Sequence, residues 1–113
     1  MGARTPAADE AILRLLGLGF RSGNVVIGVD QVRQGLLHDR FACLVVAADA
    51  SPRAQEKVVR LAAGRGVPLV GGPAAETIGG RLNRPAVMVV GVVDRALARG
   101  LVDAGSGGAH MEA

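Results

Sequence analysis

Hydrophobic and polar positions follow two spacings along the chain, and these spacings predict helices and strands in alternation. In five segments, apolar residues recur every three or four positions, which places them on one face of a helix. Four shorter segments are apolar almost throughout, as buried strands are. The predicted strands cover residues 25–27, 43–48, 67–70 and 86–93. The last of these is the longest, and its almost continuous apolar character predicts a central strand covered on both faces. Because helices precede, separate and follow them, the order predicts an α/β protein with a four-stranded sheet covered by helices on both faces.

Local capping signals define where several helices begin. Thr5-Pro6 and Ser51-Pro52 each join a capping hydroxyl to a proline that suits the first helical turn. Asp30 and Asp94 are predicted to cap the second and the last helix. Residues 74–80 suit a short helix between the third and fourth strands.

The same pattern predicts where helices end and which faces they bury. Gly17 and Gly19 are expected to end the first helix, since glycine is a poor residue for a helix interior. In the second helix, Val32, Leu36 and Leu37 share one apolar face and are expected to point into the core.

The composition of 113 residues, 50% hydrophobic and 20% charged, is that of a folded chain with one core. We expect a single domain over residues 1–104 and a flexible, glycine-rich tail over residues 105–113. A single cysteine excludes an intramolecular disulfide framework. The sequence has neither an apolar run of ~18 residues nor the start of a signal peptide. These features predict a cytoplasmic protein that does not contact a membrane.

The charge balance is basic, with 13 basic and 10 acidic residues, a net charge of +3 and a pI of about 10.4. Such an excess suits a polyanionic partner such as RNA, because cations that neutralise phosphates release counterions. It is equally common in proteins that bind no nucleic acid. Only Phe20 and Phe41 are aromatic, which argues against a broad stacking platform for single-stranded bases.

Candidate catalytic groups are few. Cys43 has His38 five residues before it, but Cys43 begins an apolar strand, where cysteine behaves as a small hydrophobic residue. Asp30, Asp49 and Asp94 each follow a predicted strand, and three carboxylates at one sheet edge can hold magnesium. Capping and turn formation explain the three aspartates more simply. We therefore expect no enzyme activity, no cofactor and no metal site.

Several short motifs together resemble a known family. The stretch Leu44 to Ser51, followed by a helix and Val67-Pro68, is the most specific of them. The others are Leu15-Leu16-Gly17-Leu18, Val25-Val26-Ile27-Gly28, Ile78-Gly79 and Val87 to Asp94. Over about residues 13–101 the chain resembles the kink-turn RNA-binding family of ribosomal proteins (the L-seven-Ae and L-thirty-e group), and most of all its bacterial YlxQ-type branch. The resemblance implies a three-layer α/β/α sandwich with a four-stranded mixed sheet, noncatalytic binding of structured RNA, and partners on the ribosome or among translation factors.

The resemblance also implies a site at the start of the second helix. Well-understood members have Gly-x-Asn-Glu-x-x-Lys here, whose Asn and Glu meet sheared G·A pairs and whose Lys meets the RNA backbone. This chain keeps Gly28 but has Asp30, Gln31 and Gln34 at the other three positions. Gln31 retains an acceptor oxygen without the charge, and Gln34 removes a cation. A carboxylate at position 30 opposes phosphate unless it only caps the helix.

Two arginines near this motif are candidates to restore the lost cation. Arg33 lies within the motif and Arg21 lies shortly before it. A guanidinium group at either position can grip a phosphate through two hydrogen bonds.

A second RNA-facing element is implied for the loop that precedes the last strand, residues 81–85. There Leu82 is a candidate apolar contact for an unstacked nucleotide, Asn83 can hydrogen-bond bases or riboses, and Arg84 can contact phosphate. The alternative is a plain exposed loop kept soluble by its arginines. The arginines of the third helix, Arg53, Arg60 and Arg65, are expected to form an ordinary solvated face.

Two other classes of function stay open at this stage. One is a protein-interaction adaptor that has kept the fold and lost specific kink-turn binding, which an exposed hydrophobic patch would favour. The other is an enzyme fragment, such as the substrate-binding domain that precedes some RNA methyltransferases.

Overall fold

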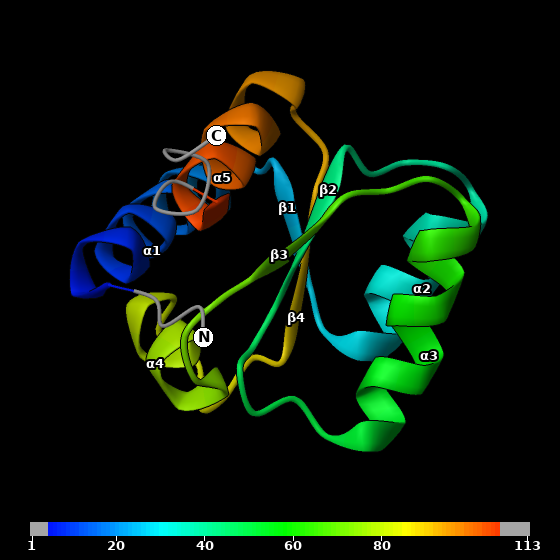
Figure 1. The fold of residues 1–113 in the computed structure, drawn as a ribbon, viewed down its shortest axis with the longest axis horizontal. Coiled ribbons are helices and arrows are strands. Elements are labelled where there is room, and N and C mark those ends of the chain that lie inside the picture. The colour runs from blue at the N-terminus through cyan, green and yellow to red at the C-terminus, as the bar shows by residue number, and fades with distance from the viewer. Residues whose placement is uncertain (1–4, 107–113) are drawn as a thin grey trace.

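The computed structural model describes residues 5–106, and its elements follow the predicted order of alternating helices and strands (Figure 1). The elements are α1 (Pro6–Arg21), β1 (Val25–Ile27), α2 (Val29–Leu37), β2 (Cys43–Val46), α3 (Pro52–Gly64), β3 (Leu69–Gly71), α4 (Ala75–Arg81), β4 (Val89–Val92) and α5 (Arg95–Ser106). None of these helices combines the length and the apolar composition needed to span a membrane.

The four strands form one mixed sheet in the order β1-β4-β2-β3. β4 runs antiparallel to both of its neighbours, while β2 and β3 are parallel. All four residues of β4 are buried, which confirms the prediction of a central strand covered on both faces. β1 is instead a half-buried edge strand, so the expectation of a fully buried strand at residues 25–27 was wrong.

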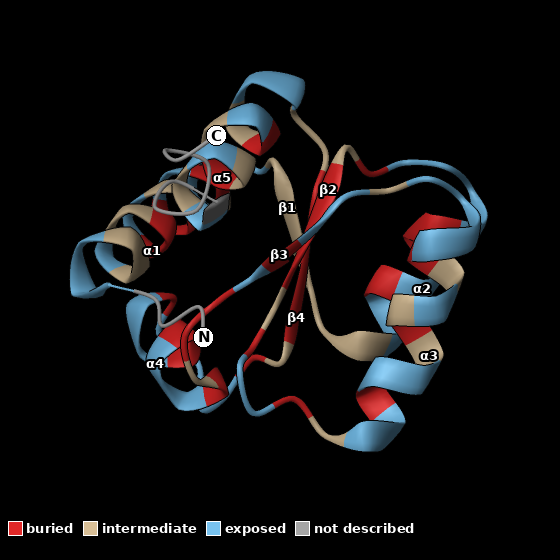
Figure 2. Cartoon of the chain, in the orientation of Figure 1, coloured by how far each residue is buried: buried red, intermediate tan, exposed pale blue. Residues whose placement is uncertain are grey.

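The helices form two layers, one on each face of the sheet. Figure 1 shows α1, α4 and α5 on one side and α2 with α3 on the other, which is the predicted α/β/α sandwich. Each face has its own apolar cluster, one around Ile12, Leu16 and Ile78 and the other around Val32, Leu44 and Val58. Figure 2 shows the buried residues along the sheet and on the inward faces of the helices.

Three of the four predicted helix caps are confirmed. Thr5 Oγ1 accepts a hydrogen bond from the Ala8 amide, and Ser51 Oγ accepts one from the Ala54 amide, both at 3.1 Å. Asp94 Oδ2 accepts from the Leu97 amide at 2.8 Å. The fourth prediction was wrong, because α2 begins one residue after Gly28 and Asp30 lies inside its first turn.

Two glycines that were expected to end the first helix lie inside it. α1 continues through Gly17 and Gly19 to Arg21, and both glycines are buried. A Cβ atom on Gly19 would lie 2.5 Å from Leu97 Cδ2 and 2.8 Å from Val25 Cγ1, so this glycine allows α1 to approach both α5 and β1 closely. The positions of glycine along the sequence do not reveal such tertiary packing, although glycine is a poor residue for a helix interior.

Two further expectations were corrected. Leu37, predicted to face inward, is 38% exposed at the last turn of α2. α5 extends through residues 105 and 106, which we had assigned to the tail. A Cβ atom on Gly105 would lie 2.8 Å from Val70 Cγ1, so this glycine fits α5 against β3. The rest of the expected tail, with His110, lies outside the described residues.

Candidate nucleic-acid interface

The two RNA-facing elements implied by the resemblance lie at the same end of the sheet. Since β1 and β4 are antiparallel, the end of β1 lies beside the start of β4. The Gly28 amide donates a hydrogen bond to the Val89 carbonyl oxygen at 3.2 Å and joins the two. The turn from β1 into α2 and the loop from α4 into β4 therefore meet here, and we call this end the candidate interface.

Gly28 shapes the turn into α2. Its φ of 105° and ψ of 146° belong to a region that favours glycine, so the residue type follows from the backbone geometry. No side chain of the described part of the chain caps α2, although the Gly28 carbonyl accepts from the Val32 amide at 2.9 Å. The amides of the first turn can therefore donate to an anion, and the helix dipole favours one.

Asp30 is paired with a cation from the neighbouring helix. Lys57 Nζ of α3 lies 3.6 Å from Asp30 Oδ1, with Asp30 86% and Lys57 39% exposed. An ion pair this exposed contributes little to stability. It does offset the negative charge that we expected to oppose phosphate. Lys57, the single lysine of the chain, was missed by sequence reasoning because only the packing of α2 on α3 brings it here.

An open groove runs between α2 and α3. Its volume is about 840 Å³. One wall is formed by Asp30, Gln31, Arg33 and Gln34 of α2, and the other by Glu56, Lys57, Arg60 and Leu61 of α3. The structure thus places the whole polar side of the α2 motif along one groove. Within this groove, Arg60 Nη1 lies 3.9 Å from Glu56 Oε2 on the same helix. Arg33 of α2 is exposed.

A smaller pocket of about 280 Å³ lies between the first turns of α2 and α3. Val29 and Met88 give it an apolar part, and Arg53 and Lys57 outweigh the negative charge of Asp30 in its lining. We had assigned Arg53 to a solvated face, but this arginine lines the pocket at the candidate interface. Met88 was also missed, because it reads as one of many apolar residues in a predicted strand.

The loop after α4 presents two of its three candidate residues to solvent. Leu82 is only 2% exposed and belongs to the core, so the prediction that it contacts a nucleotide was wrong. Asn83 is exposed and adopts a φ of 61°. The guanidinium carbon of Arg84 lies 5.6 Å from the centroid of the Phe20 ring, a cation–π geometry that positions this exposed side chain.

Arg21 lies apart from the Gly28 turn. It ends α1 just before β1 begins, so the length of β1 separates its backbone from Gly28. Its side chain runs back along α1, and a Cβ atom on Gly17 would lie 3.7 Å from Arg21 Nη1 and 3.9 Å from Arg81 Cγ. Arg81 itself binds both carboxylate oxygens of Glu10 at 3.0 Å. Arg21 therefore approaches the end of α4 and not the α2 motif.

Two of the three candidate metal-binding aspartates accept hydrogen bonds from backbone amides at the starts of helices. Asp49 Oδ1 accepts from the Ala75 amide at 2.8 Å at the start of α4, and Asp94 caps α5. Asp94 also lies at the opposite end of the sheet from Asp30, because β4 is antiparallel to β1. The three aspartates thus share no edge. Residues 5–106 contain no group of three or more His, Cys, Asp or Glu residues that could hold a metal ion.

The thiol of Cys43 is fully buried, and burial raises its pKa from 9.0 to about 12. His38 Nδ1 lies 2.9 Å from the Gln34 carbonyl oxygen at the exposed end of α2. We expect Cys43 to resist a thiol reagent in the folded protein near pH 8 and to react once denaturant unfolds it, since only the thiolate attacks. Rapid labelling of the folded chain would contradict this burial.

The same buried thiol predicts a dependence of stability on pH. The unfolded state loses the Cys43 proton near pH 9, whereas the folded state keeps it until about pH 12. Between these values the unfolded state binds fewer protons, so the free energy of unfolding decreases as the pH rises. A Cys43→Ala variant is the control, because it should lack this contribution to the pH dependence of chemical denaturation.

Comparisons with known proteins give a family and a fold. Residues 10–101 match the model of the ribosomal protein L7Ae/L30e/S12e/Gadd45 family. No curated protein matches the chain. A protein of unknown function from Bacillus halodurans has a similar structure, with a TM-score of 0.77 and 22% identity over 82% of this chain and 94% of that one. A Giardia lamblia 15.5 kD RNA-binding protein gives a TM-score of 0.76 and 17% identity over 91% and 88% of the two chains.

Proposed function

Because this chain belongs to the ribosomal protein L7Ae/L30e/S12e/Gadd45 family, we propose that it binds structured RNA without catalysing a reaction. The similar fold of the Giardia RNA-binding protein supports RNA as the partner. We further propose that its target is a kink-turn or ribosomal RNA and that the protein acts in the cytoplasm. Its expected protein partners are ribosomal proteins or translation factors.

The observation that carries the proposal is the convergence of donors and cations at the candidate interface. The first-turn amides of α2, which no side chain of residues 5–106 caps, lie beside Lys57, and Arg53 lines the adjoining pocket. Arg84 adds a further cation on the neighbouring loop, with its guanidinium group held over Phe20 of α1 on the other face of the sheet. Amides at a helix start and cations around them bind phosphate through both hydrogen bonds and charge.

Different residues of the interface suit different parts of an RNA. The side-chain oxygen of Gln31 can accept a hydrogen bond from a guanine edge, and Asn83 can bond a base or a ribose. Val29 and Met88 supply the apolar surface that we had expected from Leu82, so an unstacked base has a place beside the phosphate-binding groups. Arg33, which lines the groove from α2, suits the backbone of a following nucleotide.

The Asp30–Lys57 ion pair bears on which RNA is bound. Position 34, where the family motif has a lysine, carries the neutral Gln34 in this chain. Lys57 supplies a cation to the same groove from α3. When phosphate approaches, the ammonium group of Lys57 can bridge it to Asp30. The groove and the pocket with Val29 and Met88 beside it suit a bent RNA with splayed bases better than a regular duplex, whose bases stay stacked.

A titration against a kink-turn RNA and a matched duplex, each at two salt concentrations, tests the proposal. We expect the kink-turn to bind at least tenfold more tightly, a difference of ~1.4 kcal/mol. Arg84→Gln should weaken this binding about tenfold and lower the steepness of its salt dependence by about one phosphate contact.

The matched control is Arg40→Gln, which removes the same charge from an exposed position between α2 and β2. This control should leave the affinity within a factor of two of the original. Equal, strongly salt-dependent binding of both RNAs would restrict the function to phosphate recognition. Absence of binding to either RNA would contradict the proposal.

A further inference from the structure

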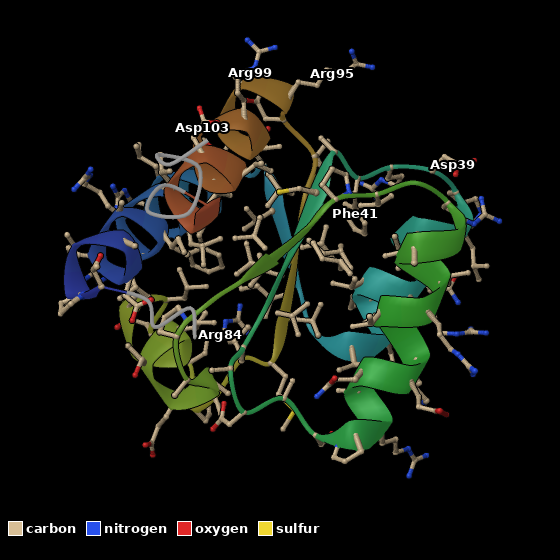
Figure 3. The ribbon with its side chains drawn as sticks, viewed as in Figure 1. Asp39, Phe41, Arg84, Arg95, Arg99 and Asp103 are labelled. Atoms are coloured by element: carbon tan, nitrogen blue, oxygen red, sulfur yellow. The ribbon has the colours of Figure 1, made fainter. Side chains whose placement is uncertain are left out.

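A second groove lies at the end of the sheet opposite the candidate interface. β2 and β3 begin at this end, β4 finishes here and α5 starts here. The groove has a volume of about 400 Å³. Its apolar lining comes from Ala42, Pro68, Ala98 and Val102, and its charged lining from Arg95, Arg99 and Asp103. Figure 3 shows Arg95 and Arg99 extending outward from α5, well apart from Arg84.

The two arginines of this groove have no partner within residues 5–106. Neither side chain makes an ion pair or a hydrogen bond in that part of the chain, whereas Arg60, Arg65 and Arg81 each pair with a carboxylate. Arg95 and Arg99 are four residues apart on α5, a spacing at which like charges destabilise a helix. Arg95 also lies in the first turn, where the helix dipole disfavours a cation. An anionic partner would relieve both effects.

We propose that this groove binds an extended segment of a partner protein with the pattern acidic–apolar–acidic. Four residues of a helix rise by about 6 Å, which separates the two arginines along α5. In an extended peptide, residues two apart lie about 6.7 Å from each other and point to the same side. Two carboxylates of such a segment therefore match Arg95 and Arg99, and charge-assisted hydrogen bonds join them.

The remaining lining specifies the other side chains of the segment. The residue between the two acids points away from α5, toward the wall formed by Ala42 and Pro68, and an apolar side chain suits that wall. Asp103 lies one turn beyond Arg99 and suits a basic residue of the partner two positions after the second acid. The pattern extends to acidic–apolar–acidic–any–basic.

The lining favours a peptide over a second RNA strand. Asp103 would repel a phosphate chain that follows α5 past Arg99. Among residues 5–106 no aromatic side chain on which a base can stack lines the groove, and its apolar lining is alanine, proline and valine. Because the groove and the candidate interface lie at opposite ends of the sheet, the protein could hold an RNA and a protein segment at once.

The test uses the full chain labelled with ¹⁵N and the peptide acetyl-Glu-Leu-Glu-Ser-Lys-amide, followed by NMR. We expect saturable shifts of the amide signals of Ala42, Ala98, Arg99 and Val102. The neutral peptide acetyl-Gln-Leu-Gln-Ser-Lys-amide should bind at least tenfold more weakly. The double change Arg95→Glu and Arg99→Glu should abolish the shifts, whereas Arg14→Glu, a charge reversal at an exposed position on α1, should preserve them.

Three results would overturn the proposal. The first is the absence of saturable shifts at the groove with millimolar acidic peptide, while the spectrum shows a folded chain. The second is equal affinity for the acidic and neutral peptides. The third is a loss of RNA affinity in the Arg95 and Arg99 double variant as large as that in the Arg84 variant, which would make the groove part of an RNA surface. Failure of RNA binding alone leaves the peptide result unaffected, so the two proposals are separable.

Discussion

Replacing Phe41 with alanine is expected to lower the free energy of unfolding by about 3–5 kcal/mol, as truncating a buried phenylalanine does in other cores. Phe41 is 7% exposed and lies between α2 and the sheet. Its ring fills the space above two glycines, since a Cβ atom on Gly91 would lie 2.6 Å from Phe41 Cζ and one on Gly35 would also clash with the ring. Truncation therefore leaves a cavity that neither glycine can fill.

Urea denaturation followed by circular dichroism measures this loss. Phe20→Ala is the matched control, because Phe20 is the other phenylalanine of the chain and is only partly buried. We expect the control to lose clearly less stability. A loss below ~1.5 kcal/mol for Phe41→Ala would mean that α2 collapses onto the sheet without the ring. Since α2 carries Asp30, Gln31 and Gln34, such a collapse would also move the candidate interface.

The sequence predicted those parts of the fold that depend on neighbouring residues. Thr5-Pro6 and Ser51-Pro52 start their helices as expected, because a capping hydroxyl and a proline act within one turn. The almost wholly apolar stretch over residues 86–93 was predicted as the central strand, since burial on both faces leaves no polar position, and β4 lies within it. The sequence did not reveal that Gly19 lies inside a helix, because the reason is its close packing against α5 and β1.

The candidate site was less predictable than the fold. Gly28 and Arg84 were predicted through the resemblance, and the turn and the loop that carry them lie at the same end of the sheet. Lys57 belongs to the same groove only because α3 packs against α2, and no local pattern reports that contact. Leu82 was assigned to the surface because it stands among polar loop residues, yet the last turn of α4 directs it into the core.

Replacing Gly79 with alanine is expected to lower both the free energy of unfolding and the affinity for RNA. A Cβ atom at this position would lie 2.7 Å from the Arg84 carbonyl oxygen and 2.9 Å from both Cα and N of Ala86. These are backbone atoms, so the loop that carries Asn83 and Arg84 must shift. Gly79 also accepts a hydrogen bond of 2.7 Å from the Arg84 amide, which fixes the loop on α4.

We expect Gly79→Ala to lower the free energy of unfolding by about 1–3 kcal/mol, the usual cost of overpacking. The affinity for structured RNA should fall more than tenfold even where the protein stays folded, because Arg84 leaves its position over Phe20. Gly80→Ala is the internal control, since a Cβ atom there meets nothing within 4 Å, and alanine in a helix gains about 0.5–1 kcal/mol over glycine. Unfolding and RNA titrations of the two variants separate the effects. A Gly79 variant that is destabilised but binds RNA as tightly as the original would show that the loop after α4 does not contact the RNA, leaving the α2 groove to bind it alone.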